Sequence, residues 1–148
     1  MVDERAFRQM LHSADPHSCP FGKAILALCC ACSLSRKRAI AERETVICTR
    51  ATAREQCCEL YALLRRNSSF ALKQAHADEP LTHARNMKVQ CGGLHGLQQA
   101  VDAAEEIGDV AALVDASREK FGSLEALPYS LIIQSVAAFQ LRKRHGKE

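Results

Sequence analysis

The chain has 148 residues, enough for one domain with a substantial core and too few for two domains of ordinary size. We therefore expect residues 1–148 to form a single domain. The net charge of +3 comes from basic residues spread along the chain, so charge alone does not indicate a nucleic-acid binder, although it leaves that partner open. A composition without tryptophan and rich in alanine and leucine favours helix over strand. We expect an all-α fold, a bundle of about six helices.

The amino terminus carries Asp3 and Glu4 before any apolar stretch, which is unlike a secretion signal. The longest apolar stretch, residues 24–34, is shorter than the roughly 20 residues that a membrane span requires. These features predict a cytoplasmic protein with no membrane contact.

The first half is expected to contain three helices. The first covers residues 3–11 and ends before Pro16, because a proline disfavours helix in the residue before it. After a loop, a second covers residues 22–42, apolar in its first part and charged in its second. Thr52 and Glu55 have the spacing of a capping box, so a third helix is expected over residues 52–66.

Residues 67–140 have the pattern of a helical scaffold. We expect helices over residues 69–77, 80–91 and 110–121, and from 128 onward. Gly92 and Gly93 are expected to stop or bend the second of these. Asp109 is expected to cap the third, and Gly122 to end it.

Cysteine is concentrated in residues 19–58, which we expect to be a metal-binding or cluster-binding segment. Seven of the eight cysteines lie there: Cys19, Cys29, Cys30, Cys32, Cys48, Cys57 and Cys58. Because a reducing cytoplasm rarely favours disulfides, so many clustered thiols indicate ligation of a metal or an iron–sulfur cluster.

Four of these cysteines form the predicted ligand set. Cys19 precedes Pro20, an arrangement also found at iron–sulfur ligands. Cys48 and Cys57 can converge because a helix is expected to begin between them. The remaining ligand is Cys32, with Cys29 or Cys30 as alternatives. On one helix Cys29 and Cys32 share a face, whereas Cys30 is turned by about 100° from Cys29.

The spacing of these ligands favours a [4Fe–4S] cluster. Structural zinc sites usually draw on closely spaced pairs, whereas here Cys19, Cys32, Cys48 and Cys57 come from four separate segments. Four thiolates leave a cluster with negative charge. Arginines that can offset this charge are Arg36, Arg43, Arg50 and Arg54.

Three other interpretations of the cysteines stay open. Soft thiolate ligands also suit copper(I), so a copper(I) or zinc binding or storage protein is the alternative function. His83, Met87 and Cys91 form a stripe of candidate ligands at helical spacing. Free cysteine is also a small apolar residue, so some of these thiols are expected to fill the core.

The function predicted from this pattern is electron transfer, or a redox accessory or sensor role, with a redox partner protein. A cluster-dependent regulator that binds DNA through basic patches, or a cluster-assembly protein, is the further alternative. No phosphate-binding loop, zinc-protease motif or nucleophile motif is present, so no catalytic residue is assigned.

Overall fold

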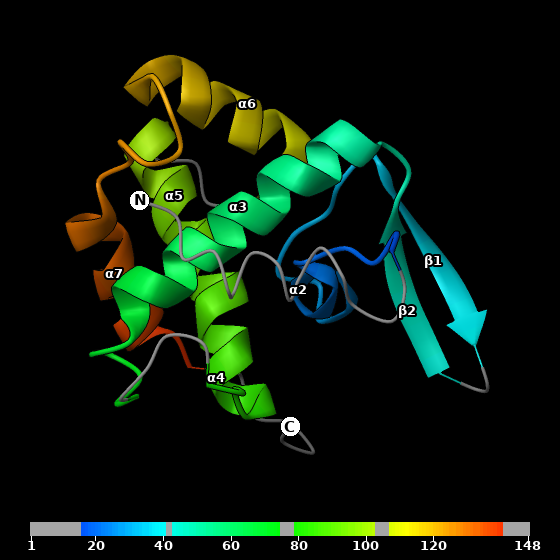
Figure 1. Cartoon of the computed structure of the whole chain (residues 1–148), viewed down its shortest axis with the longest axis horizontal. Helices are drawn as coiled ribbons and strands as arrows, with labels where there is room; N and C mark the ends of the chain where they lie inside the picture. Colours follow the sequence, from blue (N-terminus) through cyan, green and yellow to red (C-terminus); the bar gives the residue numbers. More distant parts are fainter. Residues whose placement is uncertain (1–15, 41–42, 75–78, 103–106, 141–148) are drawn as a thin grey trace.

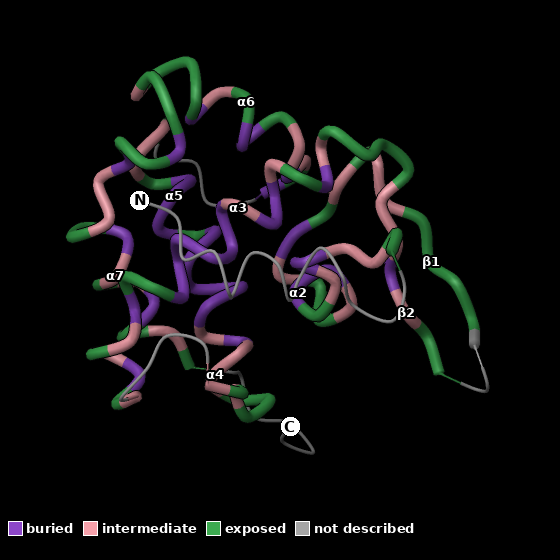
Figure 2. Tube along the Cα trace, viewed as in Figure 1, coloured by how far each residue is buried: buried purple, intermediate pink, exposed green. Residues whose placement is uncertain are grey.

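The long helix α3 (Ala51–Ser68) crosses the middle of the molecule, and the other elements pack around it (Figure 1). In this computed structural model, residues 16–40, 43–74, 79–102 and 107–140 are described. Helices α6 (Val110–Phe121) and α7 (Tyr129–Ala138) contact α3, and α5 (Gly93–Val101) packs against both α6 and α7. The apolar residues of these helices form most of the core, whereas the hairpin at one end is largely exposed (Figure 2).

The prediction of an all-α bundle is wrong, because residues 35–40 and 43–48 are the paired strands of a β-hairpin. Strands β1 (Ser35–Ile40) and β2 (Arg43–Cys48) pair antiparallel, with Arg36 opposite Ile47. The run Thr45, Val46 and Ile47 is β-branched and favours strand over helix. The fold is therefore mixed, with helices beside a two-stranded sheet.

The helix expected over residues 22–42 is only α2 (Gly22–Leu26). It ends because Leu28 adopts a left-handed backbone conformation, with φ of 66°, which a continuing helix cannot include. Leu28 is 84% exposed, so its conformation follows from the backbone reversal and not from burial of its side chain. The chain then leads through a turn into β1.

Helix α3 lies within two residues of its predicted bounds, but its amino terminus differs from the prediction. The residue before the helix is Arg50, and no side chain caps it there, so the capping box at Thr52 is not formed. Cys57, Leu60 and Leu64 are buried along one face of the helix. Burial of this face holds α3 in place without a side-chain cap.

Gly92 and Gly93 do not end a helix. The chain runs without a break from α4 (His83–Met87) through the π-helical segment η1 (Lys88–Gly92) into α5. We call this continuous helical segment, His83–Val101, the rod. A Cβ atom on Gly92 would lie 2.8 Å from the backbone oxygen of Ser135, and one on Gly93 would lie 2.8 Å from Cδ1 of Leu64. The two glycines therefore let this rod approach α7 and α3 closely.

Two helix starts in the scaffold also differ from prediction. Residues 69–73 form turns after α3, with Lys73 at φ of 58°, where a new helix was expected. The next helix begins at His83, because the hydroxyl of Thr82 accepts a hydrogen bond from the backbone N–H of Arg85 at 3.2 Å. The predicted helix over residues 3–11 lies outside the described residues.

The predictions for α6 and α7 are confirmed. The carboxylate of Asp109 accepts a hydrogen bond from the backbone N–H of Ala111 at 3.2 Å, and Gly122 follows the helix at φ of 93°. In α7, Ile132 and Val136 are fully buried. None of the helices in the described ranges is long and apolar enough to cross a membrane.

Buried hydrogen bonds and a disulfide attach the cysteine-rich segment to the rod. The side-chain oxygen of Gln90 accepts from the backbone N–H of Ala24 at 3.0 Å, and the amide of Gln90 donates to Asn86 at 3.1 Å. Cys29 is disulfide-bonded to Cys91, across 62 residues of sequence. Both residues on the rod, Gln90 and Cys91, lie in η1, so the π-helical segment is where α2 and the turn after it are attached.

Candidate cysteine site

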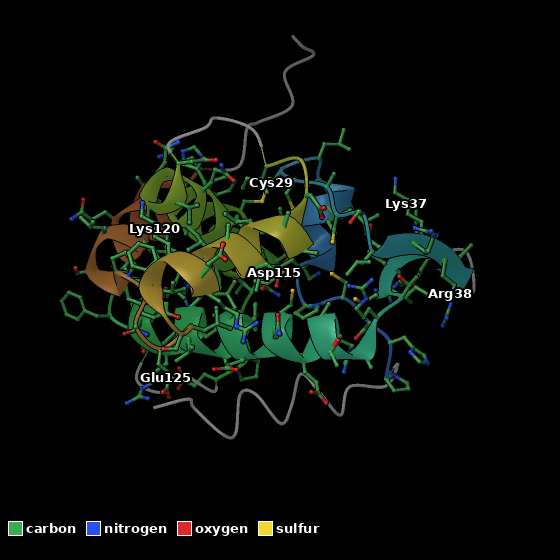
Figure 3. All side chains as sticks on the ribbon, turned by 90° about the horizontal axis from the view of Figure 1, so that it is seen from above. Cys29, Lys37, Arg38, Asp115, Lys120 and Glu125 are labelled. Carbon is green, nitrogen blue, oxygen red and sulfur yellow. A yellow bond between two sulfur atoms is a disulfide. The ribbon has the colours of Figure 1, made fainter. Side chains whose placement is uncertain are left out.

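Four cysteines from four separate segments line one small cavity. They are Cys19, Cys32, Cys48 and Cys57, and the cavity is completed by residues at the starts of α3 and α6. Figure 3 shows sulfur atoms gathered between α3, α6 and the start of the hairpin. These are the four residues of the predicted ligand set, and the structure brings all four together.

Cys19 and Cys48 are held by backbone hydrogen bonds between residues 17–19 and β2. The N–H of Cys19 donates to the carbonyl of Val46 at 2.9 Å, and the N–H of Cys48 donates to the carbonyl of His17 at 2.8 Å. Residues 17–19 therefore lie along β2 like a short additional strand. This pairing fixes two of the four thiols relative to each other.

Cys32 and Cys57 come from the turn before β1 and from the second turn of α3. The carbonyl of Cys32 accepts hydrogen bonds from the N–H of Ser35 at 3.2 Å and from its hydroxyl at 2.8 Å, which closes the turn. Cys57 is only 8% exposed, on the face of α3 that lies against the cavity.

The other cysteines do not line this cavity. Cys29 forms the disulfide with Cys91, with the two Cα atoms 5.9 Å apart, and Cys30 and Cys58 are buried in the core. Of the three candidates near the end of α2, only Cys32 lies at the site. The disulfide was not predicted, because the chain was expected to lie in a reducing cytoplasm, where disulfides are rare.

The stripe of His83, Met87 and Cys91 is not a set of metal ligands in this structure. Met87 is 1% exposed and packs in the core, and Cys91 is disulfide-bonded to Cys29, so its sulfur is not a free thiol. His83 is exposed.

Burial raises the pKa of three thiols of the site, those of Cys19, Cys32 and Cys57, and so keeps them protonated at neutral pH. Desolvation, with smaller contributions from the neighbouring Cys48 and Cys32, raises the pKa of Cys19 to about 12. Desolvation raises the pKa of Cys57 still more. A protonated thiol is a poor nucleophile, so the arrangement does not favour cysteine-based covalent catalysis. It suits a ligand that brings positive charge and displaces the protons.

Backbone N–H groups point at two of these sulfur atoms. The N–H of Phe21 is hydrogen-bonded to the thiol of Cys19, and the N–H groups of Leu34 and Ala111 to that of Cys32; each lowers the thiol's pKa against the larger effect of burial. Hydrogen bonds of this kind stabilise ligating thiolates and adjust the potential of an iron–sulfur cluster.

Positive charge and helix amino termini face the cavity. Ala53 and Arg54 lie in the first turn of α3, and Val110 and Ala111 in the first turn of α6. A helix amino terminus carries a partial positive charge that favours anions. Arg54 is only 6% exposed, and its Nε donates to the carbonyl of Ser18 at 2.7 Å. These groups offset part of the cost of burying negatively charged sulfur, whereas the carboxylate of Asp109, which is hydrogen-bonded to the thiol of Cys32, raises the pKa of that thiol.

The arginines named from the sequence differ in their positions. Arg54 lines the cavity, and Arg50 lines a neighbouring cleft. Arg36 and Arg43 lie on the hairpin. The amino terminus of α6 was not anticipated at the site. The cap at Asp109 predicted that this terminus exists, but only the tertiary packing places it beside Cys32.

The cavity is small, about 10 Å³, which is room for about one water-sized sphere. In the part of the chain that the structure describes, no three His, Cys, Asp or Glu side chains are placed to hold one metal ion. Thiolates around a single zinc ion lie within roughly 4 Å of each other. The described residues are therefore not preformed around one metal ion, and the cavity would have to widen to hold a larger group.

A second, larger hollow adjoins the site between α3 and α6. Its volume is about 220 Å³, and polar side chains line it, including Arg50, Gln56 and Asp115. Four residues line both hollows: Leu34, Ala53, Cys57 and Ala111. Cys57 is the one cysteine of the site among them, so its thiol lies beside the cleft as well as the cavity.

Searches against protein-family models, curated proteins and solved structures each gave no match.

Proposed function

We propose that this protein binds a [4Fe–4S] cluster through Cys19, Cys32, Cys48 and Cys57 and acts in electron transfer, as a redox accessory protein. The observation that supports this most strongly is the convergence of these four cysteines, from four segments, on one cavity. Four cysteine thiolates are the usual ligands of such a cluster.

The wide spacing of the four cysteines along the sequence favours a cluster over a single ion. No three candidate ligands among the described residues are placed around one metal position. A polynuclear cluster holds its thiolates further apart than one zinc or copper ion does. Its ligands can therefore come from separate segments of the chain.

The surroundings of the thiols suit the charge of a cluster. Four thiolates give a [4Fe–4S] centre a net negative charge. The first turns of α3 and α6 and the guanidinium of Arg54 supply positive charge on one side. The N–H groups that point at Cys19 and Cys32 add hydrogen bonds to the sulfur atoms.

The position of the site suits exchange of electrons with a partner protein. Cys19, Cys32 and Cys48 are half-buried, so the site lies near the surface, and the cleft beside Cys57 opens towards solvent. A bound cluster would supply one-electron transfer between a donor and an acceptor, with no bond of the protein made or broken.

Anaerobic reconstitution with ferrous iron and sulfide tests this function. The loaded protein is expected to be brown, and reduction by dithionite is expected to consume about one electron per chain and to produce a paramagnetic signal. Tight binding of one zinc ion or of copper(I) to the same cysteines, with no cluster formed under these conditions, would favour the metal-binding alternative.

A further inference from the structure

We infer that the hairpin of β1 and β2 contacts nucleic acid. We also infer that the cysteine site controls the orientation of the hairpin by holding the end of it that joins the body of the protein. We call this hairpin the basic ribbon. It leaves the body of the protein at one end, away from α7 (Figure 1). Binding by the basic ribbon rests on its own charges and shape, whereas its control by the cysteine site rests on the proposed function.

One face of the basic ribbon carries three arginines. In an antiparallel pair, alternate residues and their cross-strand partners share a face. The pairing of Arg36 with Ile47, Arg38 with Thr45 and Ile40 with Arg43 therefore places Arg36, Arg38 and Arg43 together. All three arginines are exposed. Successive arginines on β1 are about 7 Å apart along the strand.

The opposite face is partly attached to the body. Val46 on that face is 3% exposed, and its Cβ lies 3.4 Å from where a Cβ on Gly22 would be, so it packs on α2. Ser35 and Cys48 share this face and line the cysteine cavity. The arginine face is therefore the outer face. Figure 3 shows Lys37 and Arg38 on opposite faces of the hairpin.

The ribbon holds much of the positive charge of the protein. Residues 35–48 contain four basic and two acidic side chains, a net charge of +2, while the whole chain has a net charge of +3. The remaining residues are thus nearly neutral on balance. A polyanion is attracted to this element more than to the rest of the surface.

Shape and side-chain chemistry both favour nucleic acid among polyanions. A two-stranded ribbon fits the major groove of duplex DNA. Arginine binds phosphate with two parallel N–H groups, which lysine cannot do, and three of the four basic residues are arginine. The inner face of the hairpin packs on the body at Val46, which leaves the arginine face open to a partner.

The base of the ribbon is tied to the cysteine site at both ends. Cys32 lies three residues before β1, and Cys48 is the last residue of β2. The carbonyl of Leu34 accepts hydrogen bonds from the N–H and the hydroxyl of Thr49, both at 2.8 Å, which closes the base. Ligation of Cys32 and Cys48 by one cluster would fix both ends together. The orientation of the three arginines would then be set before nucleic acid binds.

The test measures binding of a fluorescent duplex DNA of about 20 base pairs by anisotropy, at several salt concentrations, for metal-free and cluster-loaded protein. The triple variant R36Q/R38Q/R43Q is compared with R66Q/K73Q/R118Q, which removes the same charge from exposed positions outside the ribbon. We expect the ribbon variant to weaken binding at low salt by about tenfold or more. Its slope of log affinity against log salt should fall by about 2 to 3. The control should change binding much less.

Iron content and thermal stability are measured for every variant, because the ribbon changes should alter neither. Duplex binding by metal-free wild-type protein that depends on the ribbon arginines supports the ribbon even if no cluster forms. Binding tighter in the loaded form, by about threefold to tenfold, supports control by the cysteine site. Equal affinity of the two forms would overturn that control.

Two results would overturn the ribbon as a nucleic-acid contact. The first is equal loss of affinity in the ribbon variant and the control variant, which would mean non-specific attraction. The second is the absence of duplex binding combined with ribbon-dependent binding to vesicles containing phosphatidylserine, which would assign the arginines to a membrane surface.

Discussion

Cys32 and Cys48 lie at the two ends of one hairpin and line the same cavity. Anything that binds both thiols also closes the base of the hairpin. The site thereby joins a cysteine-rich core to an exposed basic element, and a change at one is expected to affect the other.

Cys57 and Cys58 allow a matched test of the ligand set. They are neighbours on α3, at 8% and 0% exposure, but only Cys57 lines the cavity. We expect Cys57→Ser to abolish or strongly reduce the visible absorbance of the reconstituted cluster. Cys58→Ser should keep it, because the lost thiol is a core residue. Absorbance and iron content per folded chain measure both.

Loss of the absorbance in Cys58→Ser with its retention in Cys57→Ser would contradict the proposed ligands. Circular dichroism of both variants separates this result from simple failure to fold.

The Cys29–Cys91 disulfide is expected to stabilise the fold without holding the cluster. It links the turn after α2 to η1 across 62 residues of sequence. Cys91→Ser should lower the free energy of unfolding by about 2 to 4 kcal/mol in oxidising buffer, because the unfolded chain gains freedom. Wild-type protein treated with a strong thiol reductant should approach the same stability.

Iron content should be unchanged in Cys91→Ser and in Cys29→Ser. A cluster that is lost from Cys29→Ser but kept by Cys91→Ser would show that Cys29 is a ligand in place of Cys32.

Gly92 tests the close packing of the rod on α7. Alanine there would gain about 1 kcal/mol of helix propensity, but its Cβ would meet the Cα of Val136 at 2.8 Å. Backbone atoms cannot move aside cheaply, so we expect Gly92→Ala to destabilise the protein by about 1 to 3 kcal/mol. Chemical denaturation measures this.

Gly108→Ala is the control, since a Cβ there would meet nothing within 4 Å. Its effect should stay within about 0.5 kcal/mol. A stabilised Gly92→Ala variant would mean that α7 is not held against the rod.

Stability of the metal-free protein should fall as pH rises above about 9. Below this pH the thiol of Cys19 is protonated in both the folded and the unfolded chain. Above it the unfolded chain loses the proton, whereas burial raises the folded pKa to about 12, so unfolding becomes easier between the two values. Urea denaturation at about pH 8 and about pH 10 measures the loss.

Cys19→Ala should show a smaller loss over the same interval, because one buried thiol is gone. The cluster-loaded protein should also lose less, since ligating thiolates hold no proton. A wild-type stability that is constant between these pH values would contradict the burial of the site.

The four cysteines at the cavity could be chosen from the sequence because a helix start between Cys48 and Cys57 makes their convergence possible. Their role as ligands remains a prediction. Cys29 and Cys30 could not be ruled out as alternatives to Cys32, because their positions depend on the turn at Leu28 and on the disulfide to Cys91. Both depend on contacts with residues far away in sequence.

The hairpin was not predicted because its strand-favouring sequence is short, and because its charged residues are also typical of a solvent-exposed helix. Only residues 45–47 are a β-branched run, and Arg36, Lys37 and Arg38 have no strand preference. Helices with strong local signals were found, as at Asp109 and Gly122. The prediction at Gly92 and Gly93 was wrong because these glycines allow close contact of the rod with α7 and α3. A local sequence pattern does not show contacts between distant helices.

An elemental count on anaerobically purified protein tests the cluster most directly. Iron, acid-labile sulfide, zinc and copper are measured on one sample together with the visible spectrum. We predict brown protein with about four iron and about four sulfide per chain, and little zinc or copper. Folded, colourless protein that contains no iron, and takes up none with sulfide under reducing conditions, would contradict the proposed function.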